Sequence, residues 1–219
     1  MKVFIVGMAG GVGRRVARML AERREEATGL VRRQEQVDAL AGQGVSARLG
    51  DMLAMSVEEL AEAMRGADVF VFTAGAGGGG LEATTAIDGD GPGKLAQAAA
   101  LAGIRRFLLV SVFPEAWRER HMNEDFEHYI QEKKRAEIAL VATDLDWVIL
   151  RPSALSDDPG TGRVDLGLAK VHREITRDDV AATVVELLHA PEISRTILEV
   201  TGGAVPIEEA VSAMKPRVS

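Results

Sequence analysis

Residues 2–13 read Lys2-Val3-Phe4-Ile5-Val6-Gly7-Met8-Ala9-Gly10-Gly11-Val12-Gly13. The continuous apolar run before Gly7 is typical of a strand buried on both faces. After the glycines, apolar residues recur at the spacing of one helix face, at Val12, Val16, Met19 and Leu20. The stretch therefore predicts a strand, a glycine turn and a helix in direct succession.

This glycine turn has the properties of a dinucleotide cradle. Gly7 can make the tight turn, Gly10 lets the backbone approach a pyrophosphate, and Gly13 lets the helix pack close to the strand. The first N–H groups of the helix are free to meet phosphate oxygens. The spacing, Gly-x-x-Gly-x-x-Gly, differs from the common Gly-x-Gly-x-x-Gly, and a simple turn between strand and helix is the alternative. The predicted cradle consists of Gly7, Ala9, Gly10, Gly11, Val12 and Gly13.

Composition narrows the possible classes of partner. The chain has 219 residues, 47% of them hydrophobic, a formal net charge of −7 and no cysteine. The negative charge disfavours nucleic acids and anionic membranes as partners, and the lack of cysteine excludes disulfides and thiol catalysis. Because neither a signal peptide nor a membrane span is visible, a cytoplasmic location is expected. The histidines have no metal-ligand spacing, so no metal site is expected; they are His121, His128, His172 and His189.

Strand-like and helix-like segments alternate along most of the chain. Further strands are expected at 27–31, 45–49, 69–72, 107–110, 147–150 and 197–200. Helices are expected at 34–40, 57–64, 91–102, 124–143, 178–189 and 207–214. The glycine run that ends at Gly80 is expected to form a flexible loop over the strand ends. This alternation predicts an α/β fold with a doubly wound, mostly parallel sheet and helices on both faces.

The expected organisation is one domain, 1–219, with a cofactor-binding core at 1–150 and a short substrate-side segment at 151–219. Ligands of such sheets bind at the carboxyl ends of the strands. The residues that follow each strand are therefore the candidates for function.

Arg32 and Arg33 follow the second strand, where a site for NAD usually carries an acidic residue that binds the ribose 2′-hydroxyl. Arginine suits a 2′-phosphate through its charge and its forked donors. A solvated charge at a strand end is the alternative. The pair predicts that NADP(H) is preferred over NAD(H), with Arg32 the stronger candidate.

The third and fourth strands end in two further candidate sets. Asp51 could accept a hydrogen bond from the adenine amino group while Met52 covers the ring, although an aspartate in a turn or helix cap is common. Thr73, Ala74 and Gly75 are small enough to let the backbone approach the ribose and diphosphate, or they form a turn only.

Ser111 ends the fifth strand, and Tyr129 and Lys133 lie four residues apart on the long helix that follows. That spacing puts both side chains on one helix face. A nearby ammonium favours the phenolate, so we expect the pKa of Tyr129 to fall below its usual value of about 10. Tyr-x-x-x-Lys alone is a weak signal, but Tyr129 is the only tyrosine of the chain. The three residues are the candidate catalytic set.

These residues together resemble the short-chain dehydrogenase/reductase superfamily, in its atypical branch of NmrA-related and epimerase-like NAD(P)H-binding proteins. The resemblance covers nearly the whole chain and includes Leu150-Arg151-Pro152 and residues 176–181. It implies a seven-stranded Rossmann sheet of strand order 3-2-1-4-5-6-7 and a bound nicotinamide cofactor. It also implies that Ser111, Tyr129 and Lys133 form the active site, that Lys133 also binds the nicotinamide ribose, and that Arg151, Pro152 and Ser153 pass beside the nicotinamide.

Two departures from the family pattern matter. Ala9 stands where a threonine is usual, and the segment after Pro152 is too short for the large domain of enzymes that act on nucleotide sugars. Between Ser111 and Tyr129, the side chains of Trp117, Arg118 and His121 could line or close a substrate pocket, or belong to a surface loop.

The function expected is an NADPH-dependent oxidoreductase or epimerase-like enzyme that moves hydride between nicotinamide and a small carbonyl-type substrate. Tyr129 would give or take the proton. The alternatives are a non-catalytic NADP(H) sensor and a flavin or quinone reductase. The expected partner is a small-molecule substrate, and a homodimer is compatible with the sequence.

Overall fold

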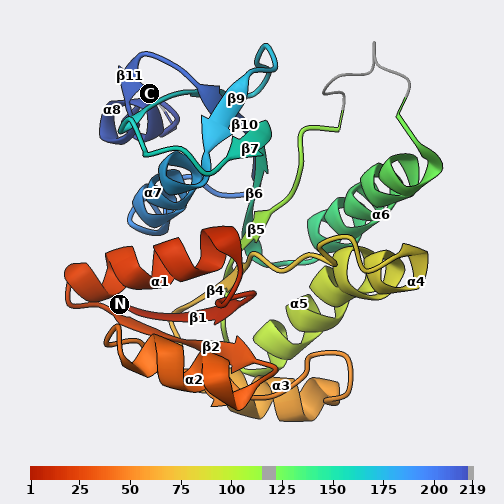
Figure 1. Ribbon diagram of the computed structural model, residues 1–219. Helices are drawn as coiled ribbons and strands as arrows, with labels where there is room; N and C mark the ends of the chain where they lie inside the picture. Colours follow the sequence, from red (N-terminus) through yellow and green to blue (C-terminus); the bar gives the residue numbers. More distant parts are fainter. Residues whose placement is uncertain (115–121, 217–219) are drawn as a thin grey trace.

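The computed structural model describes residues 1–114 and 122–216. Within these residues, nine strands form one sheet in the order β11-β8-β10-β6-β5-β4-β1-β2-β3 (Figure 1). Their bounds are β1 Lys2–Val6, β2 Glu26–Val31, β3 Arg48–Leu49, β4 Val69–Phe72, β5 Arg106–Val110, β6 Asp146–Pro152, β8 Arg163–Gly167, β10 Thr196–Gly202 and β11 Val205–Pro206. Two short strands, β7 (Ala154–Ser156) and β9 (Glu174–Thr176), pair separately.

The strands from β3 to β10 are all parallel, and their order is the predicted 3-2-1-4-5-6-7. This confirms the doubly wound α/β fold. The expected seven strands are nevertheless two too few, because β8 and β11 extend the sheet in antiparallel fashion beyond β10. Both strands come from the C-terminal segment, so this segment completes the sheet instead of forming a separate layer.

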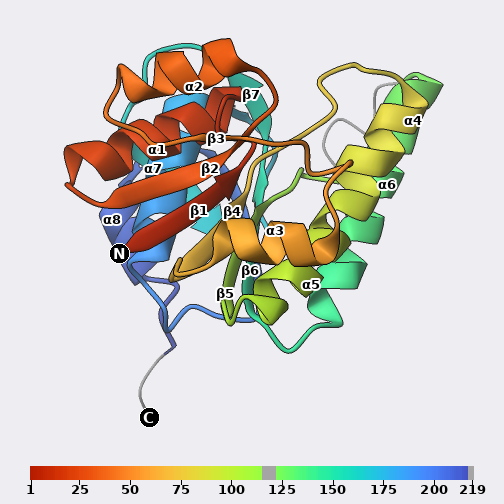
Figure 2. The same cartoon turned by 90° about the horizontal axis from the view of Figure 1, so that it is seen from below.

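Helices cover both faces of the sheet. Their bounds are α1 Gly11–Glu22, α2 Gln34–Ala41, α3 Val57–Met64, α4 Leu81–Thr84, α5 Gly91–Leu101, α6 Glu124–Val141, α7 Arg177–Leu188 and α8 Ile207–Ser212. A π-helical stretch, η1 (Thr85–Asp90), joins α4 to α5, although the sequence predicted a helix only from residue 91. Figure 2 shows α1, α2 and α7 on one side of the strands and α3, α5 and α6 on the other.

The core is divided by the sheet into two apolar layers. Val3 and Ile5 of β1 pack into the layer of α1 and α7, while Phe4 of the same strand packs with Phe70 and Phe107 under α3 and α5. This is the alternation that a strand buried on both faces requires. The continuous apolar run at the start of the chain therefore supplies both layers at once.

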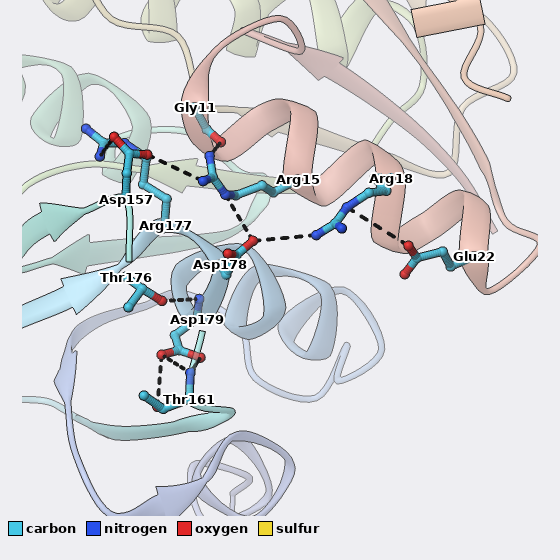
Figure 3. Close-up of polar contacts among 10 residues, drawn as sticks. All are labelled: Gly11, Arg15, Arg18, Glu22, Asp157, Thr161, Thr176, Arg177, Asp178 and Asp179. Atoms are coloured by element: carbon cyan, nitrogen blue, oxygen red, sulfur yellow. Dashed lines mark hydrogen bonds and ion pairs between the residues drawn. The ribbon is translucent and has the colours of Figure 1, made fainter. Parts of the chain in front are cut away.

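Charged residues hold α7 against α1, the helix that follows the glycine turn (Figure 3). Arg15 Nε donates to Asp178 Oδ1 at 3.0 Å, and Arg18 Nη2 lies 3.5 Å from the same oxygen. Arg177 Nη1 pairs with Asp157 Oδ2 at 3.0 Å. The pairs that Asp178 makes with Arg15 and Arg18 supplement the apolar packing of α7 on α1.

Asp179 ties the start of α7 to the segment before β8. Its buried carboxylate accepts the backbone N–H groups of Thr161 and Gly162, at 3.0 and 2.8 Å, and the Thr161 hydroxyl at 3.0 Å (Figure 3). Thr176 caps the helix by accepting the Asp179 N–H at 3.0 Å. The start of α7 is thus fixed on both sides.

Candidate functional site

The turn after β1 has the shape that its glycines allow. Gly7 has φ +92°, and a Cβ there would lie 2.4 Å from the backbone nitrogen of Ala74. A Cβ on Gly13 would lie 2.3 Å from the Gly7 carbonyl oxygen, so α1 packs closely on the strand as expected. A Cβ on Gly10 would approach only that same oxygen, at 3.0 Å. Gly7 and Gly13 are therefore needed by the chain itself, whereas the space beside Gly10 is left open.

A cavity of about 280 Å³ opens beside this turn, at the carboxyl ends of β1 to β4. Nine of the predicted cofactor residues line it: Gly7, Ala9, Gly10, Arg32, Asp51, Met52, Thr73, Ala74 and Gly75. The start of α1 has no side-chain cap at Gly10, so its first N–H groups can serve an anion. A glycine with open space beside it, uncapped N–H groups and a cavity that spans four strand ends fit a dinucleotide.

Other predicted cofactor residues lie outside the wall of this cavity: Gly11, Val12, Gly13, Arg33, Lys133, Pro152 and Ser153. Val12 and Gly13 are buried under the first turn of α1. The Ser153 hydroxyl accepts the backbone N–H of Arg173 at 3.1 Å, so it joins the end of β6 to the residue before β9. The Arg177 side chain lies so close to Gly11 that a Cβ there would be 2.8 Å from its Cδ.

Arg32 lies at the exposed rim of the cavity. Gln36, which the sequence did not single out, also lines the cavity and accepts the backbone N–H groups of Arg32 and Arg33 at 3.2 and 3.1 Å. The backbone after β2 is thereby fixed, while the Arg32 guanidinium is at the surface.

Asp51 and Met52 form part of the cavity wall in a turn. One carboxylate oxygen of Asp51 accepts the Leu53 N–H at 2.9 Å, as in a turn aspartate. Lys94 of α5 donates to the carbonyl oxygens of Met52 and Leu53 at 2.9 and 3.3 Å. Asp51 therefore acts as a turn aspartate, which was the alternative to a role in adenine binding. Because Asp51 also lines the cavity, a hydrogen bond to the adenine amino group stays a prediction.

Tyr129 and Lys133 lie on one face of α6, as their spacing predicts. Lys133 Nζ lies 5.7 Å from the centroid of the Tyr129 ring and 3.0 Å from Asp88 Oδ1. Lys133 is 4% exposed and Asp88 is fully buried. Asp88 Oδ2 accepts the backbone N–H of Ala76 at 2.9 Å, beside the Gly75 of the cavity wall. The ion pair therefore connects α6 to the rim of the cavity.

The expected fall in the pKa of Tyr129 is wrong in direction. Burial raises the pKa of Tyr129 above its usual value, Lys133 lowers it and Asp88 adds to the rise. The pKa of Lys133 is also raised: burial opposes its charge, but Tyr129, Asp88 and Glu137 together outweigh burial. The sequence pattern indicated the Lys133 ammonium beside Tyr129. It indicated neither the burial of the phenol nor the nearby Asp88 carboxylate.

Ser111 is buried at the end of β5, and its hydroxyl donates to Glu137 Oε1 at 2.6 Å. Arg151 of β6 binds both oxygens of the same carboxylate, with Nε 3.0 Å from Oε1. The hydroxyl proton of Ser111 is thus already used, which leaves its lone pairs to accept a bond. Ser111 can therefore hold a substrate oxygen only by accepting a hydrogen bond from it, so that oxygen must be a hydroxyl and not a carbonyl.

Sequence reasoning missed Asp88 and Glu137. Asp88 lies in Asp88-Gly89-Asp90, a composition that favours a turn and not a π-helix. Glu137 follows Lys133 by four residues, so the helical spacing that related Tyr129 to Lys133 could have found it. Trp117, Arg118 and His121, proposed as pocket residues, lie outside the described part of the chain.

The strand order, the glycine turn and the cavity at the strand ends define a Rossmann-type dinucleotide-binding protein. The chain belongs to the NAD(P)H-binding family, whose model matches residues 7–191. No helix in the described ranges is long and apolar enough to cross a membrane.

Individual relatives agree with this assignment. The chain is 37% identical to the uncharacterized sugar epimerase YhfK of Bacillus subtilis over 216 residues, 98% of this chain and all of that protein. A putative NAD-dependent epimerase/dehydratase from Bacillus halodurans superposes with a TM-score of 0.87 at 31% identity, over 97% of this chain and 99% of the other. ChuY, an anaerobillin reductase from Escherichia coli O157:H7, gives 0.79 at 27% identity, over 94% and 98%.

Proposed function

We propose that this protein is an NADPH-dependent oxidoreductase or epimerase-like enzyme that acts on a small carbonyl-type substrate, with Tyr129 as the group that donates the proton. The observation that carries the proposal is the buried Lys133, which lies between Tyr129 and Asp88 next to the loop that lines the cavity. A buried ion pair beside a ligand cavity is costly for folding alone and is typical of functional sites.

Relatives of this chain point to the same reaction classes. One is described as a sugar epimerase and another as an anaerobillin reductase.

Separate residues bind the cofactor and transfer the proton in the proposed reaction. The glycine turn and the first N–H groups of α1 bind the diphosphate, and Arg32 binds the 2′-phosphate that distinguishes NADPH from NADH. Hydride exchange is the chemistry that a bound nicotinamide supplies there. Tyr129 donates its phenolic proton to the substrate oxygen, Lys133 orients the phenol, and Ser111 accepts a hydrogen bond because its own proton is held by Glu137.

Replacing Tyr129 by phenylalanine tests the proposal. A panel of aldehydes, ketones, quinones and flavins is first screened with NADPH and the unmodified protein. With a substrate in hand, Tyr129→Phe should lower turnover by about 10²–10⁴-fold, because general acid catalysis typically contributes that much. The dissociation constant for NADPH should stay the same, since the ring is retained.

The control is Ile138→Ala, a change at a largely exposed position of the same helix, which should leave turnover unchanged. Full turnover by Tyr129→Phe would exclude the phenol as proton donor and favour hydride transfer to a flavin or quinone. A panel without any substrate, combined with tight NADPH binding, would favour a sensor.

A further inference from the structure

Asp88 holds a position that links three parts of the molecule. It lies in η1, is fully buried, and directs one carboxylate oxygen at Lys133 of α6 and the other at the backbone N–H of Ala76. Gly75, the neighbour of Ala76, lines the cavity. A carboxylate so enclosed requires a nearby cation, and an ammonium buried like that of Lys133 requires an anion.

The π-helical turn is what brings Asp88 to Lys133. Its neighbours in η1 are also fastened to α6: Thr85 Oγ1 lies 2.8 Å from His128 Nε2, and Arg135 Nη1 lies 2.6 Å from Asp90 Oδ1. A π-helical insertion costs stability and occurs frequently at functional sites. The wide turn therefore holds Asp88 in place through contacts on both sides of it.

We propose that Asp88 is a positioning residue that neutralises Lys133 and so keeps the Tyr129 phenol protonated, which makes Tyr129 a proton donor and not a base. The donor role rests on the proposed function. The electrostatic relation among the three side chains does not depend on it.

Within the described ranges, the other charged groups around Tyr129 and Lys133 are engaged elsewhere or lie at the surface. Glu137 also favours the charged form of Lys133, but its carboxylate is bound by Arg151 of β6. Asp90 is paired with Arg135, Lys94 of α5 donates to two carbonyl groups, and Glu82 of α4 is exposed. His128 contacts Thr85. Asp88 is the carboxylate that contacts the Lys133 ammonium directly, at 3.0 Å.

The sign of the effect follows from the charges. A lone ammonium beside a phenol stabilises the phenolate and lowers the phenol pKa, whereas a carboxylate opposes it. Burial is the largest influence on the pKa of Tyr129, Lys133 lowers this pKa, and Asp88 opposes Lys133, so the pKa lies above its ordinary value. Tyr129 therefore keeps its proton across the neutral range.

The test uses the fact that Tyr129 is the only tyrosine of the chain. Its ionisation can be followed directly by the ultraviolet absorbance of phenolate in the full-length protein, without cofactor or substrate. In Asp88→Asn, which keeps the size of the side chain and can still accept the Ala76 N–H, the pKa of Tyr129 should fall by about 1–3 units. The control, Asp90→Asn, removes a neighbouring carboxylate of η1 that does not contact Lys133 and should leave this pKa unchanged.

An unchanged pKa of Tyr129 in folded Asp88→Asn would overturn the proposal. If Asp88→Asn does not fold, Asp88→Asn/Lys133→Gln replaces the ion pair by two neutral side chains of similar size. Because the pair already acts as a neutral unit, the pKa of Tyr129 should then stay within about one unit of the unmodified value. A larger rise would mean that Asp88 does not neutralise Lys133, and would overturn the proposal equally.

Activity separates this inference from the proposed function. If both are correct, the alkaline limb of the turnover profile moves to lower pH in Asp88→Asn by the same amount as the phenol titration. If the phenol titration moves and the activity limb does not, the electrostatic proposal stands and Tyr129 is not the proton donor.

Discussion

At the scale of single residues, one hydrogen bond limits what Ser111 can do. Its hydroxyl proton goes to Glu137, whose other contacts come from Arg151. A hydroxyl has one proton and two lone pairs, so Ser111 can still accept but cannot donate a second bond. In the proposed reaction the group that donates to a carbonyl oxygen is therefore not Ser111, and the phenol of Tyr129 is the donor that we propose.

Arg32 allows a test of cofactor preference at the same scale. If Arg32 binds the 2′-phosphate as proposed, Arg32→Glu should weaken NADPH binding by roughly 10- to 100-fold, because the variant loses a charge-assisted hydrogen bond and adds repulsion. NADH binding should be unchanged or stronger, since a carboxylate can accept the 2′-hydroxyl proton. Titration of both cofactors measures the effect.

Arg33→Glu is the matched control, because Arg33 lies outside the cavity wall. Equal affinity of the unmodified protein for NADPH and NADH would remove Arg32 from the site.

At the scale of elements, the strands and helices that the sequence predicted have a clear local pattern, such as hydrophobic periodicity or a helix cap. The elements that the sequence did not predict have no such pattern. Residues 57–64 form α3 at the predicted bounds, with a capping box in which Ser56 and Glu59 bind each other's backbone N–H groups. By contrast, β11 has two residues and β8 pairs only with strands from the same C-terminal segment, so both depend on tertiary context. The π-helix follows glycines at 77–80 that give no helical pattern.

The candidate site divides in the same way. The glycine turn and the position of Tyr129 and Lys133 on one helix face could be predicted, because spacing in sequence fixes these relations in space. The functional roles of these residues stay predictions. The contacts that Asp88 and Arg151 make with α6 could not be predicted, because their partners lie on another element. A charge pattern along the chain does not reveal which carboxylate will be buried against which cation.

Arg106 at the start of β5 holds the end of a distant helix. Its buried guanidinium donates to the carbonyl oxygens of Ile193, Leu187 and Ala190, at 2.6, 3.0 and 3.3 Å, and so caps the C-terminus of α7. Arg106→Met should lower the free energy of unfolding by about 2–4 kcal/mol, because three carbonyl oxygens lose their charged donor. Denaturant unfolding measures this loss.

The neighbouring Arg105→Gln serves as control. Arg105 is exposed and pairs with Asp146 at 3.3 Å, so its loss should cost less than about 1 kcal/mol. Equal losses for the two variants would contradict the capping role of Arg106.

At the scale of the whole molecule, the cofactor cavity lies where four strands end, so a ligand there braces much of the sheet. NADPH at about a hundred times its dissociation constant should stabilise the fold by about 2.7 kcal/mol and raise Tm by about 5–10 °C. Gly10→Val should abolish this rise, because its side chain fills the space beside the turn, while Tm without NADPH changes little. A thermal melt with and without NADPH measures both.

An NADPH-induced rise that persists in Gly10→Val would show that the cradle lies elsewhere. Leu101→Ala, at an exposed position of α5, should melt with the same NADPH-induced rise as the unmodified protein.

The packing of α7 on α1 has a consequence for how the chain emerges from the ribosome. The apolar face of α1, with Val16, Ala17 and Leu20, is covered by α7, which begins some 160 residues later. Until that helix has been synthesised, the nascent chain exposes this face, and surfaces of this kind are what chaperones recognise. A premature stop codon between residues 153 and 177 should therefore yield an aggregation-prone fragment, even though the glycine turn and the first six parallel strands would already have been translated.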